Sequence, residues 1–78
     1  METIKTIHEL EEFVDTHQNC LVPITKDLAE SFENALAMPY HCREANMPYQ
    51  FATIFMRASK LQECMMIKNI TYIVEGGN

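Results

Sequence analysis

The chain has 78 residues, a length that suits one small domain rather than a large enzyme framework of the barrel or doubly wound kind. Its apolar content of 47%, with only two Gly and three Pro, is not typical of a disordered tail or a fibrous repeat. The formal net charge is −5, which repels phosphate backbones and anionic membrane surfaces. We therefore expect one globular domain over residues 1–78, with direct nucleic-acid and membrane binding disfavoured.

The charge is unevenly distributed along the chain. Residues 1–39 carry eight acidic side chains against Lys5 and Lys26, whereas residues 40–78 carry three acidic side chains against four basic ones. Such segregation indicates either a face that selects a partner by charge, or charges that neutralise one another within the fold or across a symmetric dimer. A short chain also has a small apolar core, so we expect a homodimer or a bound protein partner.

The cysteines and the amino terminus bear on the cellular compartment. The first residues, METIKTIHELEEF, lack the positive region and apolar run of a secretory signal, and no stretch approaches 18 apolar residues. Cys20, Cys42 and Cys64 are odd in number and widely spaced, which differs from the even disulfide framework of a small secreted domain. These features predict a cytoplasmic protein.

A first helix is predicted from Thr6 to about Gln18. Thr6 and Glu9 have the spacing of a capping box, in which their side chains satisfy free amides at a helix start. Apolar residues then recur at helical spacing from Ile7 through Leu10 to Val14, with acidic residues on the opposite side. The pattern is that of an amphipathic helix with an acidic exposed face.

A second helix is predicted after a short apolar segment, Cys20 to Ile24. Pro23 lacks an amide donor, which limits that segment to a connector or a short edge strand. Thr25 is the expected cap, and Leu28, Phe32, Ala35 and Leu36 form one apolar stripe. Pro39 is expected to end this helix near Met38.

A long loop, 38–48, precedes the strongest helix pattern in the chain. Beyond Pro48, apolar residues recur at helical spacing, and we expect them to face the core: Phe51, Ile54, Phe55, Ala58, Leu61 and Met65. Gln50, Thr53, Arg57, Lys60 and Cys64 fall on the other side. The alternative is a strand over 50–56 and a hairpin at Lys68-Asn69, although that turn lacks the glycine that hairpins favour.

The last segment, Ile70 to Val74, is β-branched and aromatic, which predicts a strand that pairs either with Cys20–Ile24 or with a second copy. The expected fold is therefore an α-rich α+β domain with two short acidic helices, one longer amphipathic helix and a C-terminal strand. The alternative fold is two helices packed on a small antiparallel sheet.

The histidines and cysteines suggest chemistry only weakly. His17 and Cys20 have the spacing of paired zinc ligands, but His41 and Cys42 are adjacent and so diverge. Cys42 beside Arg43 could form a reactive thiolate, yet no other motif completes an active site. We expect no catalytic residue, no bound metal and no cofactor, with a small metal-binding domain as an alternative.

The surface residues favour protein binding instead. We expect a non-catalytic inhibitor or adaptor that engages a protein partner, with a basic or nucleic-acid-binding protein as one such partner, through acidic helix faces and a methionine-rich flank. The predicted partner-binding residues are Glu11, Glu12, Asp15, Glu30, Glu33, Met56 and Cys64. A small DNA- or RNA-binding regulator using Arg57, Lys60 and Lys68 is the other alternative, although three cations make a weak phosphate-binding surface.

Overall fold

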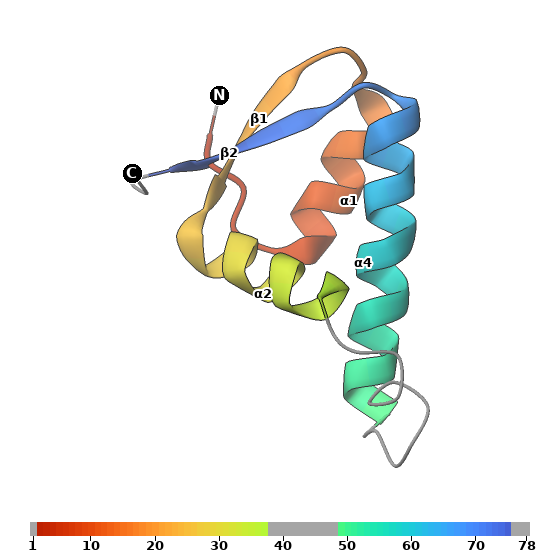
Figure 1. Ribbon diagram of the computed structural model, residues 1–78. Coiled ribbons are helices and arrows are strands. Elements are labelled where there is room, and N and C mark those ends of the chain that lie inside the picture. Colours follow the sequence, from red (N-terminus) through yellow and green to blue (C-terminus); the bar gives the residue numbers. More distant parts are fainter. Residues whose placement is uncertain (1, 38–48, 76–78) are drawn as a thin grey trace.

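The computed structural model describes residues 2–37 and 49–75, with the backbone alone for 49–52. Its elements in chain order are α1 (Ile7–Thr16), β1 (Leu21–Thr25), α2 (Lys26–Leu36), α4 (Tyr49–Ile67) and β2 (Thr71–Glu75) (Figure 1). The prediction of a helix-rich α+β fold is confirmed, and residues 50–67 are helical rather than extended.

Both short helices begin at the predicted threonines. The Thr6 hydroxyl accepts a hydrogen bond from the Glu9 amide at 3.1 Å, and the Glu9 carboxylate accepts one from the Lys5 amide at 3.2 Å. The Thr25 hydroxyl accepts from the Leu28 amide at 3.2 Å. Each cap satisfies an amide that has no partner inside its helix, so a few adjacent residues fix where each helix starts.

Helix α4 ends in a motif that turns the chain directly into β2. The Ile70 amide donates to the Met65 carbonyl at 2.8 Å and the Asn69 amide donates to the Met66 carbonyl at 3.2 Å. Asn69 has φ of 56°, in the left-handed region that asparagine tolerates better than most residues. This Schellman pattern commonly brings an apolar residue beyond the helix against its last turn, and Ile70 and Met65 are both in the core.

The two strands are parallel, so the alternative fold with a small antiparallel sheet is wrong. Leu21 is aligned with Thr71 and Thr25 with Glu75. A parallel pair cannot be closed by a tight hairpin, because the chain must return to the end of the sheet from which it left. Here α2 and α4 belong to that return path, and Lys68-Asn69 ends a helix instead of forming a hairpin.

The outer edge of β1 is closed by the N-terminal segment. The Ile4 amide donates to the Pro23 carbonyl and the Thr25 amide donates to the Ile4 carbonyl, both at 2.9 Å. Pro23 therefore faces this edge with its carbonyl, and its missing amide costs no bond to β2. Of the two partners considered for the C-terminal strand, the structure has the Cys20–Ile24 segment, and proline is accommodated on the side away from β2.

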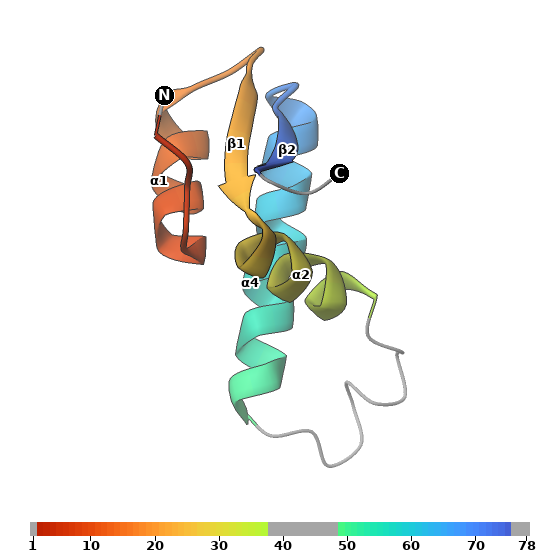
Figure 2. The same ribbon diagram turned by 90° about the vertical axis from the view of Figure 1, so that its left-hand side faces the viewer.

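The opposite edge of the sheet, along β2, has no strand partner among the described residues. The Thr71 amide donates to the Cys20 carbonyl at 3.0 Å, so by alternation the amides of Tyr72 and Val74 point away from β1. Figure 2 shows α1 beyond β1 on one side, whereas β2 is the last strand on the other side. Among the described residues, the β1 edge is therefore covered by the Ile4 segment, whereas the β2 edge has no strand beside it.

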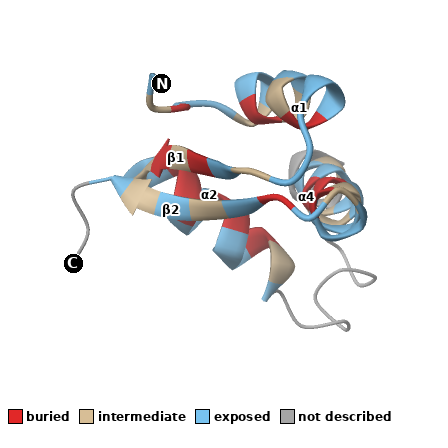
Figure 3. Ribbon diagram, turned by 90° about the horizontal axis from the view of Figure 1, so that it is seen from above, coloured by how far each residue is buried: buried red, intermediate tan, exposed pale blue. Residues whose placement is uncertain are grey.

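The core lies between one face of the sheet and helices α1, α2 and α4. Val22 and Ile24 on β1 are fully buried, as is Leu10 on α1, and α4 contributes Ala58, Leu61 and Met65. Figure 3 looks onto the opposite face of the sheet, with α2 behind the strands and α4 at their end. Leu21 (52% exposed) and Ile73 (47% exposed) lie on that uncovered face. No helix in the described residues is long and apolar enough to span a membrane.

Two assignments on α4 need correction. Ile54, expected in the core, is 43% exposed, and Cys64, expected on the polar side, is half-buried against the core. The buried residues of α4 among those described are Ala58, Leu61 and Met65, and Cys64 packs beside them, whereas Ile54 lies one turn before this cluster begins. The predicted caps and loop within 38–48 lie outside the described residues.

Replacement of Leu61 by Asp should unfold the domain or destabilise it by several kcal/mol, because it places an unpaired charge at a position only 5% exposed. The matched control is Gln62→Asp on the neighbouring exposed position, which should change the free energy of unfolding by less than about 0.5 kcal/mol. Urea denaturation of both variants measures the difference, and similar midpoints would contradict the helical phase described for α4.

Replacement of Asn69 by Val should destabilise the domain by about 1–2 kcal/mol, because a β-branched residue is strained at positive φ. Asn69→Gly relieves that strain and loses only the exposed side-chain bond to Asn19, so it should stay close to wild type. Thermal denaturation compares the two variants, and equal stability of Val and Gly would show that the turn is not left-handed in solution.

Candidate functional site

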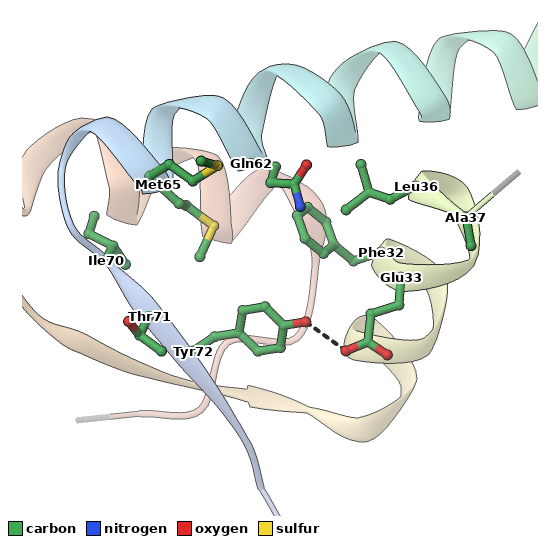
Figure 4. A pocket seen from close by; sticks show the side chains of 10 residues that line it. Phe32, Glu33, Leu36, Ala37, Gln62, Met65, Ile70, Thr71 and Tyr72 are labelled. Atoms are coloured by element: carbon green, nitrogen blue, oxygen red, sulfur yellow. Dashed lines mark hydrogen bonds between the residues drawn. The ribbon is translucent and has the colours of Figure 1, made fainter.

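A groove of about 680 Å³ lies between α2, α4 and β2, and we name it the edge groove because it runs beside the open edge of β2 (Figure 4). Most of its lining side chains are apolar: Phe32, Leu36, Ala37, Met65, Met66 and Ile70. Met66 is 75% exposed, so an apolar side chain stands in solvent at the rim of the groove. An apolar hollow beside unpaired backbone amides combines the two features that bind extended peptides.

Tyr72 and Glu33 form the polar part of this groove. The Tyr72 hydroxyl donates to the Glu33 carboxylate at 2.6 Å, and its ring meets Phe32 edge-on with centroids 6.0 Å apart (Figure 4). Burial raises the pKa of Tyr72 to about 12, and the hydrogen bond to Glu33 and its negative charge add to the shift. The pair holds β2 against α2 and places a carboxylate at the rim of the groove.

A second groove, of about 510 Å³, lies between α1 and α4, and we name it the helix groove. Its floor is apolar, with Val14 and Leu61, and its rim is charged. Arg57 donates to the Glu11 carboxylate across the groove, which raises the pKa of Arg57 above its already high ordinary value. The Lys68 ammonium donates to the carbonyls of Val14 at 2.7 Å and Asp15 at 3.2 Å, where it complements the negative end of α1.

Four of the seven predicted partner-binding residues line the helix groove: Glu11, Asp15, Met56 and Cys64. Glu33 lies instead in the edge groove. Glu12 is exposed and pairs with His8 at 3.0 Å, and Glu30 is exposed on α2. The acidic residues thus belong to several surfaces, and Glu11 and Glu33 each have a partner within the fold.

The two proposed metal ligands within the described residues have structural contacts of their own. The His17 ring stacks on Phe13 with centroids 3.9 Å apart, and its Nδ1 lies 2.9 Å from the Phe13 carbonyl. Cys20 is half-buried against the core. His41 and Cys42 lie outside the described residues. Within 2–37 and 49–75, no group of three or more metal-ligating side chains comes together.

The cations proposed for nucleic-acid binding are largely engaged within the fold. Arg57 is paired with Glu11, and Lys68 bonds the carbonyls at the end of α1. Lys60 is exposed on α4. Two of the three positive charges therefore contribute to the packing of α1 on α4, which reduces the charge offered to phosphate.

The edge groove was not predicted from the sequence, although one signal for it was present. The β2 segment contains neither Lys nor Pro, two residues that commonly protect a sheet edge. A comparison of the chain with models of known protein families, with curated proteins and with solved structures finds no match. Function therefore has to be argued from the surfaces themselves.

Alkaline titration should show one tyrosine whose phenol ionises at about pH 12, since burial and Glu33 oppose its negative charge. The pKa of Tyr72 in the folded protein is above the unfolded value of about 10. The protonated phenol therefore contributes fully to the free energy of unfolding below pH 10, and this contribution is lost as the pH rises toward 12. The absorbance of phenolate measures the transition. Tyr72→Phe should remove this late phase, and Glu33→Gln should lower its midpoint; an unchanged midpoint in Glu33→Gln would contradict the bond.

Proposed function

We propose that this protein is a non-catalytic interaction module that binds an extended segment of a partner protein along β2. The observation that carries the proposal is that β2 has no strand partner on its outer side among residues 2–37 and 49–75, and that this edge lies beside the edge groove. Natural proteins usually protect a free sheet edge, and here the other edge is protected by Pro23 and the Ile4 segment. An edge left open next to an apolar hollow is a ready site for an added strand.

Two kinds of contact would hold the incoming segment. The outward amides and carbonyls of Tyr72 and Val74 would pair with its backbone, which gives affinity with little dependence on sequence. Every second side chain of the segment would enter the edge groove against Leu36, Met65 and Met66, which gives specificity for apolar residues.

The charge of the surface favours a segment that is basic as well as apolar. Glu33 lies at the groove and Glu75 at the end of β2, and the whole chain carries a net charge of −5. Opposite charge raises the encounter rate and disfavours acidic competitors. Binding of this protein to such a segment would prevent the segment from contacting other molecules, as an inhibitor does. Alternatively it would link the partner to a second protein, as an adaptor does.

The test selects peptides from a displayed random library with the wild-type protein as bait and then measures their affinity for edge variants. Val74→Pro removes an amide that points away from β1, so the ladder between the strands stays intact while strand addition is blocked. We expect the affinity of the selected peptides to fall about tenfold or more, since a backbone bond is lost and the proline ring obstructs close approach.

Val74→Ala is the matched control, because it shortens the same side chain and keeps the amide. It should bind the selected peptides within about threefold of wild type, a difference below 1 kcal/mol. Circular dichroism and thermal denaturation check that both variants remain folded. Peptides that bind Val74→Pro as tightly as Val74→Ala, or a selection that yields neither apolar nor basic residues, would refute strand addition at β2.

A further inference from the structure

We propose that two copies of this chain associate through the face of α4 that points away from the rest of the molecule. We name this the outer face of α4 and define it by Met56, Lys60, Glu63 and Ile67; Met56 and Lys60 also lie at the rim of the helix groove. Figure 1 shows α4 along one side of the molecule, with α1, α2 and the sheet all on its other side. The proposal does not rest on peptide binding at β2.

The outer face carries large apolar side chains in solvent. Met56 is 68% exposed and Ile67 is 77% exposed, among the highest values for large apolar residues in the described chain. Lys60 and Glu63 between them are also exposed. Ala58, Leu61 and Met65 point the opposite way, into the core. A helix with apolar residues on both sides is typical of one that packs against a second surface as well as its own core.

The spacing of the outer face is that of a coiled-coil seam. Its residues follow one another at intervals of four, three and four, which is the alternation of a and d positions that keeps a stripe facing a second helix. The stripe covers about 16 Å of helix, at about 1.5 Å per residue. This length gives about three turns of contact, with apolar residues at both ends and charges in the middle.

The stripe is complementary to itself in one orientation only. Met56 and Ile67 are equally distant from the midpoint between Leu61 and Gln62, and so are Lys60 and Glu63. When two α4 helices pack antiparallel about that midpoint, each Met56 meets the Ile67 of the partner copy and each Lys60 meets its Glu63. Parallel packing would instead oppose Lys60 to Lys60 and Glu63 to Glu63, which like-charge repulsion disfavours.

This charge pattern identifies the occupant as a second copy. The two-fold axis doubles each contact, so one stripe supplies two apolar pairs and two ion pairs. Since the central pairs are charged and partly hydrated, they set the orientation, while the apolar ends supply most of the affinity. We expect a dimer that dissociates on dilution.

The test is sedimentation equilibrium of the full chain and of charge variants on α4. Wild type should approach twice its 9.0 kDa mass as concentration rises. Lys60→Glu and Glu63→Lys should each raise the dissociation constant about tenfold or more, because each creates like-charge pairs across the axis. The double variant Lys60→Glu with Glu63→Lys should restore association, since the pairs are re-formed with their charges exchanged.

A mixture of the two single variants gives a sharper result. The Lys60→Glu variant has acidic residues at positions 60 and 63, and the Glu63→Lys variant has basic residues at both. The mixture should therefore form a heterodimer although each variant alone is monomeric. Lys26→Glu on α2 makes the same charge change away from α4 and is the control, which should associate as wild type does. Circular dichroism confirms that each variant is folded.

The register is tested by disulfide formation in a background with the native cysteines replaced by serine. Met56→Cys mixed with Ile67→Cys should cross-link readily, whereas either variant alone should not, because its two thiols lie about 16 Å apart along the helices. Wild type that stays monomeric at millimolar concentration, single variants that associate like wild type, or a double variant that fails to recover would each overturn the proposal and leave the face to a different protein.

Discussion

Parallel pairing of β1 with β2 is the constraint on which the rest of the structure depends. A parallel pair requires a return path, and here α2 and the 19-residue α4 supply it, so both helices are held close to the sheet. The same pairing makes β1 the inner strand, with the Ile4 segment on its far side, and leaves β2 as an edge. The edge groove forms because α2 and α4 both reach past that edge. Thus the topology that builds the core also places the apolar edge groove beside the outer side of β2.

The features that could be predicted from the sequence are those set by a few neighbouring residues. The helix start at Thr6 follows from two side chains three residues apart, and the start at Thr25 follows from one capping hydroxyl. The buried positions Ala58 and Leu61 follow from helical spacing. The direction of the strands could not be predicted, because it depends on how the whole segment between them crosses the molecule. The exposure of Ile54 could not be predicted either. The apolar spacing of a helix shows which side is buried but not how far along the helix its neighbours cover that side.

The separation of acidic and basic residues along the chain is partly neutralised within the fold. Glu11 of the acidic half pairs with Arg57 of the basic half, and Lys68 bonds carbonyls at the end of α1. Glu9 completes the α1 cap and Glu33 accepts from Tyr72. Sequence alone left open whether such charges act inside the fold or toward a partner, because their pairing joins residues 46 and 39 positions apart. What remains for a partner is a reduced negative field rather than one continuous acidic face.

Helix α4 carries apolar residues on two sides. One stripe enters the core through Ala58, Leu61 and Met65, and the outer face lies on the other side. Because the edge groove borders α4 at Gln62 and Met66, strand addition and helix pairing would use different sides of one helix. A dimer formed through α4 would then hold two edge grooves in a fixed relation. Such an assembly would bind a partner with two suitable segments more tightly than one groove alone, since the second contact would be intramolecular. Dimerisation through α4 would in that case raise the affinity for the partner, although the α4 interface itself would not contact the bound segments.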